Sequence, residues 1–285
     1  MKKTFQFLWV ILFLSACSTK NKTDKLGLDN PILFSQTVYE LNGVVKDNNF
    51  PPIIASRNYT YAAIAAYETM VLGDSKFQSL ANQLNGLTSL PQQNLENVNF
   101  HYATLLAFCK VGESVTFPKG SLAAQIQKID SIAKADGLSS TQIEASKKLA
   151  DAVATHIITW SKKDNYAATR TGEKYQITQE EGRWIPTPPM YAEALEPHWK
   201  EIRTMVMDSA SQFKPVRPFV FDMKNKSSDY YKEVLSVKNA IDSLTDEQKH
   251  IADFWDDLGN RTIVEGHVMF TAKKFSPPGH WMNIV

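Results

Sequence analysis

Apolar residues recur every three or four positions along most of the chain, which is the spacing of one face of an α-helix. The first such run starts after Asn30, a helix-capping residue followed by proline, and it ends before Pro51. Residues 57–72 are rich in Ala and Tyr and almost uncharged, which predicts a helix that is buried on most sides and stopped by Gly73. Residues 86–99 have no such period and predict a loop.

Further helices are predicted in the first half of the chain. One covers residues 100–115, and another opens at Ser121. The next begins after Ser139, which together with Gln142 has the spacing of a capping box, in which each side chain bonds the backbone N–H of the other residue. These helices would extend the same bundle.

The second half becomes helical only after a long irregular segment. Residues 164–197 hold many Pro, Trp and Tyr without a stable period, and they predict an ordered crossover loop with a short strand near residues 174–178. Loops of this length inside a compact protein usually carry function. Later helices are predicted near residues 197–207, over residues 228–243, and at two capping boxes, Thr245 with Gln248 and Thr262 with Glu265.

The whole pattern predicts an all-α fold, a multi-helix bundle with a long irregular crossover loop rich in Pro and aromatic residues. The sequence lacks the alternation of strands and helices that builds a parallel sheet. With 285 residues, the chain is long enough to bury a sizeable core.

The first residues are typical of a bacterial lipoprotein signal. Two lysines precede an apolar run, residues 5–14, which is too short to span a membrane. The sequence Leu-Ser-Ala-Cys17 then has the form of a lipobox, in which cleavage precedes Cys17 and its thiol is lipidated. We therefore expect residues 1–16 to be a signal peptide and residues 17–29 a lipid-anchored tether. The protein would sit on a cell-envelope membrane, facing the periplasm or the cell surface.

Charge and cysteine content exclude some classes of function. The formal net charge is +1, and the sequence has no basic block, so nucleic acid is not an expected partner. Apart from Cys17 the only cysteine is Cys109, which lies in an apolar helical run and is expected to be a buried, unreactive residue.

One group of acidic residues near the C-terminal end resembles a metal site only loosely. Asp253, Asp256 and Asp257 share a predicted helix, with Glu265 and His267 close behind. The spacing matches no diagnostic ligand pattern, and carboxylates commonly gather at the start of a helix, so no metal site is predicted. His267 has Val and Met neighbours and is expected to be a hydrogen-bonded core histidine.

Several stretches together resemble the bacterial vanadium-dependent haloperoxidase-like proteins of the type-2 phosphatidic acid phosphatase superfamily. Their order and spacing carry the resemblance, which runs from about Asp29 to the end of the chain. The matching stretches are residues 55–68, 160–166, 183–191, 196–199, 208–213, 266–270 and 276–281.

The resemblance implies an oxyanion site in the whole protein, where vanadate or a phosphate is met by preorganised donors. In the family these donors are a Lys followed by an Arg-Pro pair, a Ser-Gly-His, and a Ser-Arg followed by a His that ligates vanadium or attacks phosphorus. They lie in the C-terminal half of relatives. The family does not decide between halide oxidation and phosphate-ester hydrolysis.

Local strings in this chain imitate those motifs without completing them. Arg217-Pro218 has Ala210 where the Lys is needed, and Gly279-His280 follows a proline instead of a serine. Arg261 and His267 have the family spacing, but Asn260 stands in place of the Ser. We therefore predict no catalytic residue, no metal ligand and no bound vanadate in this chain; vanadate is expected only in a full-length relative.

The last residues, Trp281 to Val285, resemble the first turn of another buried helix. Residues 30–285 are therefore expected to be the helical N-terminal part of a haloperoxidase-like domain, ending before the catalytic motifs. A set of Arg, Trp and His residues is expected to face the missing half, by interface packing more than by lining a channel. The set is Arg183, Trp184, His198, Trp199, His267, His280 and Trp281.

Three functional hypotheses follow. The favoured one is an inactive, lipid-anchored helical portion of a haloperoxidase-like or phosphatase-like enzyme. A rival is a non-enzymatic surface lipoprotein that binds glycan or a partner protein through its aromatic-rich loop. In the third, a second polypeptide supplies the missing half, and the isolated chain would aggregate through exposed faces of Tyr59, Tyr67, Val268 and Trp281.

Overall fold

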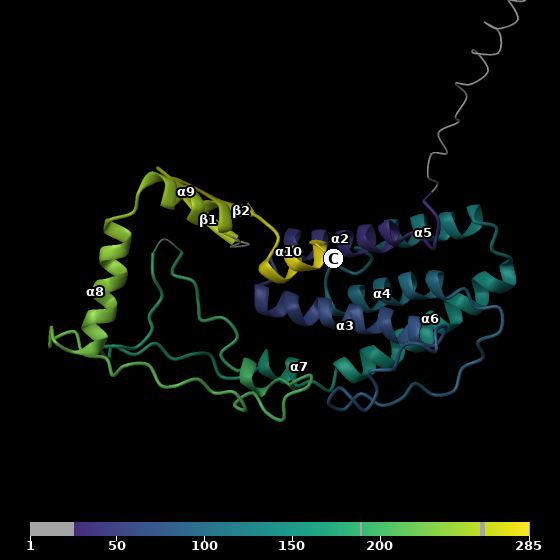
Figure 1. Ribbon diagram of the computed structural model, residues 1–285, viewed down its shortest axis with the longest axis horizontal. Helices are drawn as coiled ribbons and strands as arrows, with labels where there is room; N and C mark the ends of the chain where they lie inside the picture. Colours follow the sequence, from purple (N-terminus) through teal and green to yellow (C-terminus); the bar gives the residue numbers. More distant parts are fainter. Residues whose placement is uncertain (1–25, 189, 257–259, 285) are drawn as a thin grey trace, which may run out of the picture.

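The computed structural model describes residues 26–188, 190–256 and 260–284 (Figure 1). Cys17, the signal peptide and most of the expected tether lie outside the described residues. The described part is helical apart from its loops and one small hairpin, as predicted for an all-α bundle. Its bundle helices are α2 (Pro31–Asp47), α3 (Pro52–Val71), α4 (Phe100–Val115), α5 (Ala123–Ala135) and α6 (Ser140–Ser161).

The core of the bundle lies where α3 packs along α4 and α4 packs along α6. Tyr61 of α3 and Phe108 of α4 are completely buried there. The predicted burial of α3 on most sides is confirmed, because its buried residues cover more than half of its circumference. The helix begins at Pro52, earlier than predicted, since a proline at the first helical position lacks only an N–H that would have no helical partner.

Side-chain caps fix most of the predicted helix starts. Asn30 Oδ1 accepts a hydrogen bond from the backbone N–H of Ile32 at 3.0 Å, and the capping box of Ser139 with Gln142 is present. The prediction for Ser121 is wrong by two residues. Helix α5 begins at Ala123, because Glu113 instead accepts the backbone N–H of Leu122 at 2.9 Å and ends the loop there.

The second half of the chain is much more open. Figure 1 shows the helices α8 and α9 and the hairpin at the end of the molecule remote from α4 to α6. The helix predicted over residues 228–243 and the capping box predicted at Thr245 are both present, and Ser228 caps the first of these helices. The elements of this half are α7 (Tyr166–Thr169), η1 (Trp199–Glu201), α8 (Asp229–Asp242), α9 (Asp246–Trp255), β1 (Asn260–Glu265), β2 (Val268–Lys273) and α10 (Pro277–Ile284).

Two predictions for the crossover segment are wrong. Residues 174–178 do not form a strand, since no neighbouring strand pairs with them and a lone strand leaves its backbone groups without ladder bonds. Residues 197–207 form only the short η1. The backbone N–H of Arg203 bonds the carbonyl of Asp164 at 3.0 Å, which draws the chain away from a helical path.

The helix predicted from Thr262 is also wrong, because these residues form β1 of a hairpin. Glu265 pairs with Val268, which leaves Gly266 and His267 as a two-residue turn. Gly266 has φ +61°, a conformation that favours glycine and matches the twist of hairpin strands. Valines at both sides of the turn favour a strand over the helix suggested by the Thr–Glu spacing.

Helix α10 packs on α2 and α3 and closes one side of the bundle (Figure 1). Asn42 Nδ2 donates to the carbonyl of Gly279 at 2.7 Å, and Asn42 Oδ1 accepts from the hydroxyl of Tyr59 at 2.5 Å. The third hypothesis requires an exposed face on Tyr59, but this residue is 2% exposed, because it lies beneath α10. The predicted terminal helix exists, but Trp281 is 69% exposed on its outer side.

Two further observations concern the membrane and the cysteine. Within the described ranges, no helix is both long and apolar enough to cross a bilayer. Cys109 is buried in α4, and burial raises the pKa of its thiol far above the ordinary value. The prediction of a buried, unreactive Cys109 is therefore confirmed.

Candidate functional site

A buried carboxylate joins the bundle to the start of the crossover segment. Asp164, just after α6, is 1% exposed in its side chain. Its Oδ2 accepts from Arg57 Nε at 2.7 Å and from the hydroxyl of Tyr61 at 2.9 Å. Its Oδ1 accepts the backbone N–H of Tyr166 at 2.9 Å. These donors compensate for the removal of the charge from water, which would otherwise be costly.

Just after the crossover segment, the chain returns to the same place, where Arg203 contacts the bundle. This guanidinium lies over the Trp160 ring at 4.3 Å from its centroid and donates from Nη1 to the Trp160 carbonyl at 3.1 Å. Its Nη2 donates to the hydroxyl of Tyr61 at 3.0 Å. Burial, and then the charge of Asp164, raise the pKa of Tyr61 far above its ordinary value, so the phenol stays protonated as a donor. Both ends of the crossover are thus fixed at one polar centre.

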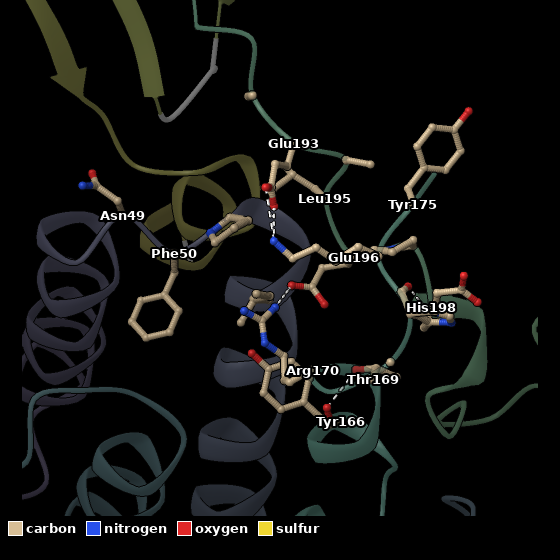
Figure 2. A pocket seen from close by; sticks show the side chains of 18 of the residues that line it. Asn49, Phe50, Tyr166, Thr169, Arg170, Tyr175, Glu193, Leu195, Glu196 and His198 are labelled. Carbon is tan, nitrogen blue, oxygen red and sulfur yellow. Dashed lines mark hydrogen bonds and ion pairs between the residues drawn. The ribbon is translucent and has the colours of Figure 1, made fainter. Parts of the chain in front are cut away.

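The crossover segment forms a polar pocket of about 500 Å³ against the N-terminal end of α3 (Figure 2). Two ion pairs line it. Arg170 Nη1 bonds the carboxylate of Glu196, and Lys174 Nζ lies 3.1 Å from Glu193 Oε2. Figure 2 shows Arg170 and Glu196 pointing toward each other, with Glu193 near them.

His198 lies at the side of this pocket and is held by both ring nitrogens. Nε2 lies 2.7 Å from the carbonyl of Glu173, and Nδ1 lies 3.0 Å from Glu201 Oε1. The bond to the Glu173 carbonyl, and then the bond to Glu201, raise the pKa of His198 above its ordinary value. Gly172 permits this arrangement, since a Cβ there would lie 2.8 Å from the imidazole ring.

Aromatic rings form two walls of the pocket. Tyr175 and Trp184 meet edge to face with ring centroids 5.5 Å apart, and Trp184 is 48% exposed. Phe50 and Phe117 lie on the bundle side with centroids 4.5 Å apart. Exposed ring faces beside paired charges suit a ligand that can both stack and exchange hydrogen bonds.

The charges of this pocket do not fit vanadate or phosphate. Its cations are Arg170 and Lys174, and its carboxylates are Glu173, Glu193 and Glu196. Each cation already has a carboxylate partner, so a tetrahedral oxyanion would meet no uncompensated positive charge. A neutral ligand that bears hydroxyl groups fits these walls better, and no step through vanadate can be derived from them.

The structure separates the residues expected to face a missing half. Trp184 and His198 line the pocket, and Trp199 packs edge to face on Tyr166 with centroids 6.4 Å apart. Arg183 is exposed and pairs with Glu180 at 3.1 Å. The remaining members, in the hairpin turn and in α10, do not line the pocket; they are His267, His280 and Trp281.

The prediction that His267 is a core histidine is wrong. It occupies the hairpin turn between β1 and β2 and is exposed. The nearby acidic residues also differ from expectation. Asp253 lies in the last turn of α9 and Asp256 is its C-cap, so they do not begin a helix, since Thr245 sets the start.

No group of three or more His, Cys, Asp or Glu residues is positioned for a metal ion within the part of the chain that the structure describes. Asp257 lies outside that part. The short sequences that imitate the family motifs have other positions in the structure. In α10, the N–H of His280 donates to the carbonyl of Ser276 at 2.8 Å, so it is not available to an anion. Arg217 lies in an exposed loop, and the side chain of Arg261 is outside the description.

Sequence reasoning missed the polar centre around Asp164. Asp164 and Arg57 both fall inside stretches that carry the family resemblance, but neither received a role. The available signal was an Arg on a helix that is otherwise almost uncharged, because a buried charge of this kind needs a partner of opposite sign. The pairing of Arg170 with Glu196 had no local signal in the sequence.

Comparison with known proteins finds a solved structure that is similar to this chain. No family profile matches the chain, and no curated protein matches it. The crystal structure of a bacterial vanadium-dependent iodoperoxidase does match, with 34% sequence identity and a TM-score of 0.77. The match covers 89% of this chain, which spans 60% of the length of the iodoperoxidase. The matched part of this chain is therefore vanadium-haloperoxidase-like in both sequence and fold.

Proposed function

We propose that this chain is the helical part of a vanadium-haloperoxidase-like protein and does not by itself hold the oxyanion-binding residues. Further polypeptide, in the same chain or in a second one, would supply them. In this assembly the bundle acts as the scaffold, and the centre around Asp164 positions the crossover segment. Halide oxidation is the activity that the iodoperoxidase relative suggests, and phosphate-ester hydrolysis is the other chemistry of the resembled superfamily.

The observation that carries this proposal is the charge pairing in the polar pocket. The two cations that could meet an oxyanion are each neutralised by a carboxylate, whereas an oxyanion site needs preorganised donors with positive potential. The relative has a substantial further part that this chain does not match, which leaves room for those donors elsewhere.

The test uses vanadate, hydrogen peroxide and iodide with a halogen-acceptor dye. We expect no turnover above the protein-free control for the chain alone. We expect turnover when the unmatched part of the iodoperoxidase is added as a separate polypeptide. Turnover by the chain alone, or no turnover by the mixture, would contradict the proposal.

Lipid anchoring at Cys17 is part of the same proposal. Support comes from the Leu-Ser-Ala-Cys17 sequence, and the anchor would place the helical part at a cell-envelope membrane. Cells grown with a labelled fatty acid should give a labelled protein, and Cys17→Ser should abolish the label. A labelled Cys17→Ser variant would contradict lipidation at this residue.

A second candidate function is glycan binding at the crossover segment. The observation in its favour is the exposed ring of Trp184 beside Tyr175, next to the paired charges of the pocket. Aromatic faces stack on sugar rings, and the charged side chains can bond hydroxyl groups. Binding on a glycan array that is lost in Trp184→Ala but kept in Phe254→Ala, an aromatic change far along the chain, would support it. An array without signal would contradict it.

A further inference from the structure

An apolar groove of about 630 Å³ runs over the bundle between α2, α3 and α4. Phe34 of α2, Met70 of α3 and Leu105 of α4 are among its walls, and Met282 of α10 forms one edge. The groove is separate from the polar pocket of the crossover segment, with which it shares no lining residue. An open apolar groove of this size on a soluble domain usually marks a binding surface.

A buried polar atom in the groove lacks a partner. Thr104 of α4 lines the groove, and only 6% of the residue is exposed. Its hydroxyl makes no hydrogen bond to any of the described residues. A buried hydroxyl without a partner costs about 1–3 kcal/mol, and because this oxygen is itself covered, it does not contact an occupant of the groove in the present arrangement.

The groove continues an interface that is already present. Helix α10 lies on α2 and α3, and it is fixed there by the bond from Asn42 to Gly279. Met282, in the last turn of this helix, is the point where the α10 interface meets the groove. The same face of the bundle therefore already accepts one helix, and the groove is the adjacent position.

We propose that the groove receives the apolar face of an amphipathic helix from the polypeptide that completes the haloperoxidase-like protein. The inference rests on the proposed function and names the docking position of the completing part. Such a helix would place apolar side chains at intervals of three and four residues into the groove.

The charge of the groove favours a helix over an anionic lipid. Its described lining includes Asp29 and no Lys or Arg. A fatty acid or phospholipid could bury its chain among the apolar walls, but its negative head would meet Asp29, and beside His101 the described lining offers it no Lys or Arg. A helix face has no such head, because its own backbone bonds are satisfied internally.

The probe for the experiment is the unmatched part of the solved iodoperoxidase, expressed as a separate polypeptide. Its binding to the full chain is measured by titration calorimetry. Met70→Glu places a charge in the groove and should weaken binding at least tenfold. Ser56→Glu makes the same kind of change on an exposed position of α3 outside the groove and should leave binding unchanged.

A second variant guards against misfolding. Ala63→Trp fills the groove with an apolar ring instead of a charge, at a half-buried position, and should also weaken binding at least tenfold. Circular dichroism and thermal unfolding of each variant check that the bundle is intact. Weakening in both groove variants, with the control unchanged, supports the proposal.

Other outcomes overturn it. Equal binding by the parent chain and the groove variants would place the contact elsewhere and remove the groove proposal, while turnover in the mixture would leave the proposed function standing. Binding that is weakened by the groove variants, in a mixture that shows no turnover, would support the groove proposal and contradict the proposed function. Palmitate that binds in the groove without displacing the polypeptide would show that the occupant is a lipid and would also overturn the proposal.

Discussion

The bundle and the C-terminal arm, residues 208–273, have similar hydrophobic spacing but very different burial. In the bundle, Leu33 and Leu41 lie on one helix face and are fully buried against other helices. In the arm, Val234, Val237 and Ile241 also share one face of a helix, α8, yet all three are exposed. Helix spacing in a sequence thus specifies a helix and an apolar face, but a core forms only where a second face is available.

The largest loss of stability is expected where an ion pair attaches the crossover segment to the bundle. Arg57→Ala leaves the Asp164 carboxylate buried without its ion-pair partner, which should lower the free energy of unfolding by about 3–5 kcal/mol. Chemical denaturation measures the loss. Arg217→Ala, an exposed arginine in the arm, is the matched control and should change stability by less than about 0.5 kcal/mol. Similar losses in the two variants would remove the distinction between the regions.

The next prediction compares the loss of one apolar side chain from the bundle core with the loss of one from the arm. Leu41→Ala creates a cavity in the bundle core and should cost about 2–5 kcal/mol of unfolding free energy. Phe254→Ala removes a larger ring from α9, but that ring is 73% exposed, so the change should stay within about 0.5 kcal/mol. Both are measured by urea denaturation of the isolated chain. A loss for Phe254→Ala as large as that for Leu41→Ala would mean that the arm has a core of its own.

A smaller effect concerns the helix that returns from the arm to the bundle. Gly279→Ala places a methyl group against the Asn42 amide and the Tyr59 hydroxyl, so α10 must shift or leave. We expect a loss of about 1–3 kcal/mol, as for other overpacked contacts. Hydrogen exchange should increase in α10 and stay unchanged in α4 and α6. Unchanged exchange in α10 would mean that the contact is looser than the structure indicates.

The smallest effect is a pH dependence at His198. Its pKa is raised in the folded state, so its stabilising contribution is complete below the ordinary value of 6.5 and is lost as the pH rises through the folded value. The difference in melting temperature between the parent chain and His198→Gln should therefore be larger at acidic pH than at pH 9. A difference that grows toward alkaline pH would contradict the sign.

The bundle was predictable because its signals are local. Asn30 and Ser139 cap helices through residues two or three positions away, and helical spacing does not require knowledge of the partner helix. The failures occur where distant contacts decide. The segment near Arg203 leaves its predicted helix because of a bond to Asp164, and the strand from Asn260 depends on pairing with Lys273.

The candidate site was less predictable for the same reason. Trp184 and His198 were predicted to face the missing half of the protein, and both line the polar pocket. The shape of the pocket also depends on the ion pair between Arg170 and Glu196. These two residues are 26 positions apart in the sequence, and no periodic pattern predicts that they meet. Burial of Tyr59 under α10 could not be predicted either, since it requires the position of Gly279.

The attachment of Asp164 and Arg203 to one polar centre has a consequence for how such a protein can change. A segment whose two ends are fixed to the same rigid frame can be exchanged or lengthened while the frame keeps its shape. The entropic cost of a longer closed segment grows slowly, by about 0.6 kcal/mol for each doubling of its length. We therefore expect that the part of the segment between α7 and η1 can be lengthened or exchanged at small cost, while Tyr166 and Trp199 at its two ends keep their packing on the bundle core.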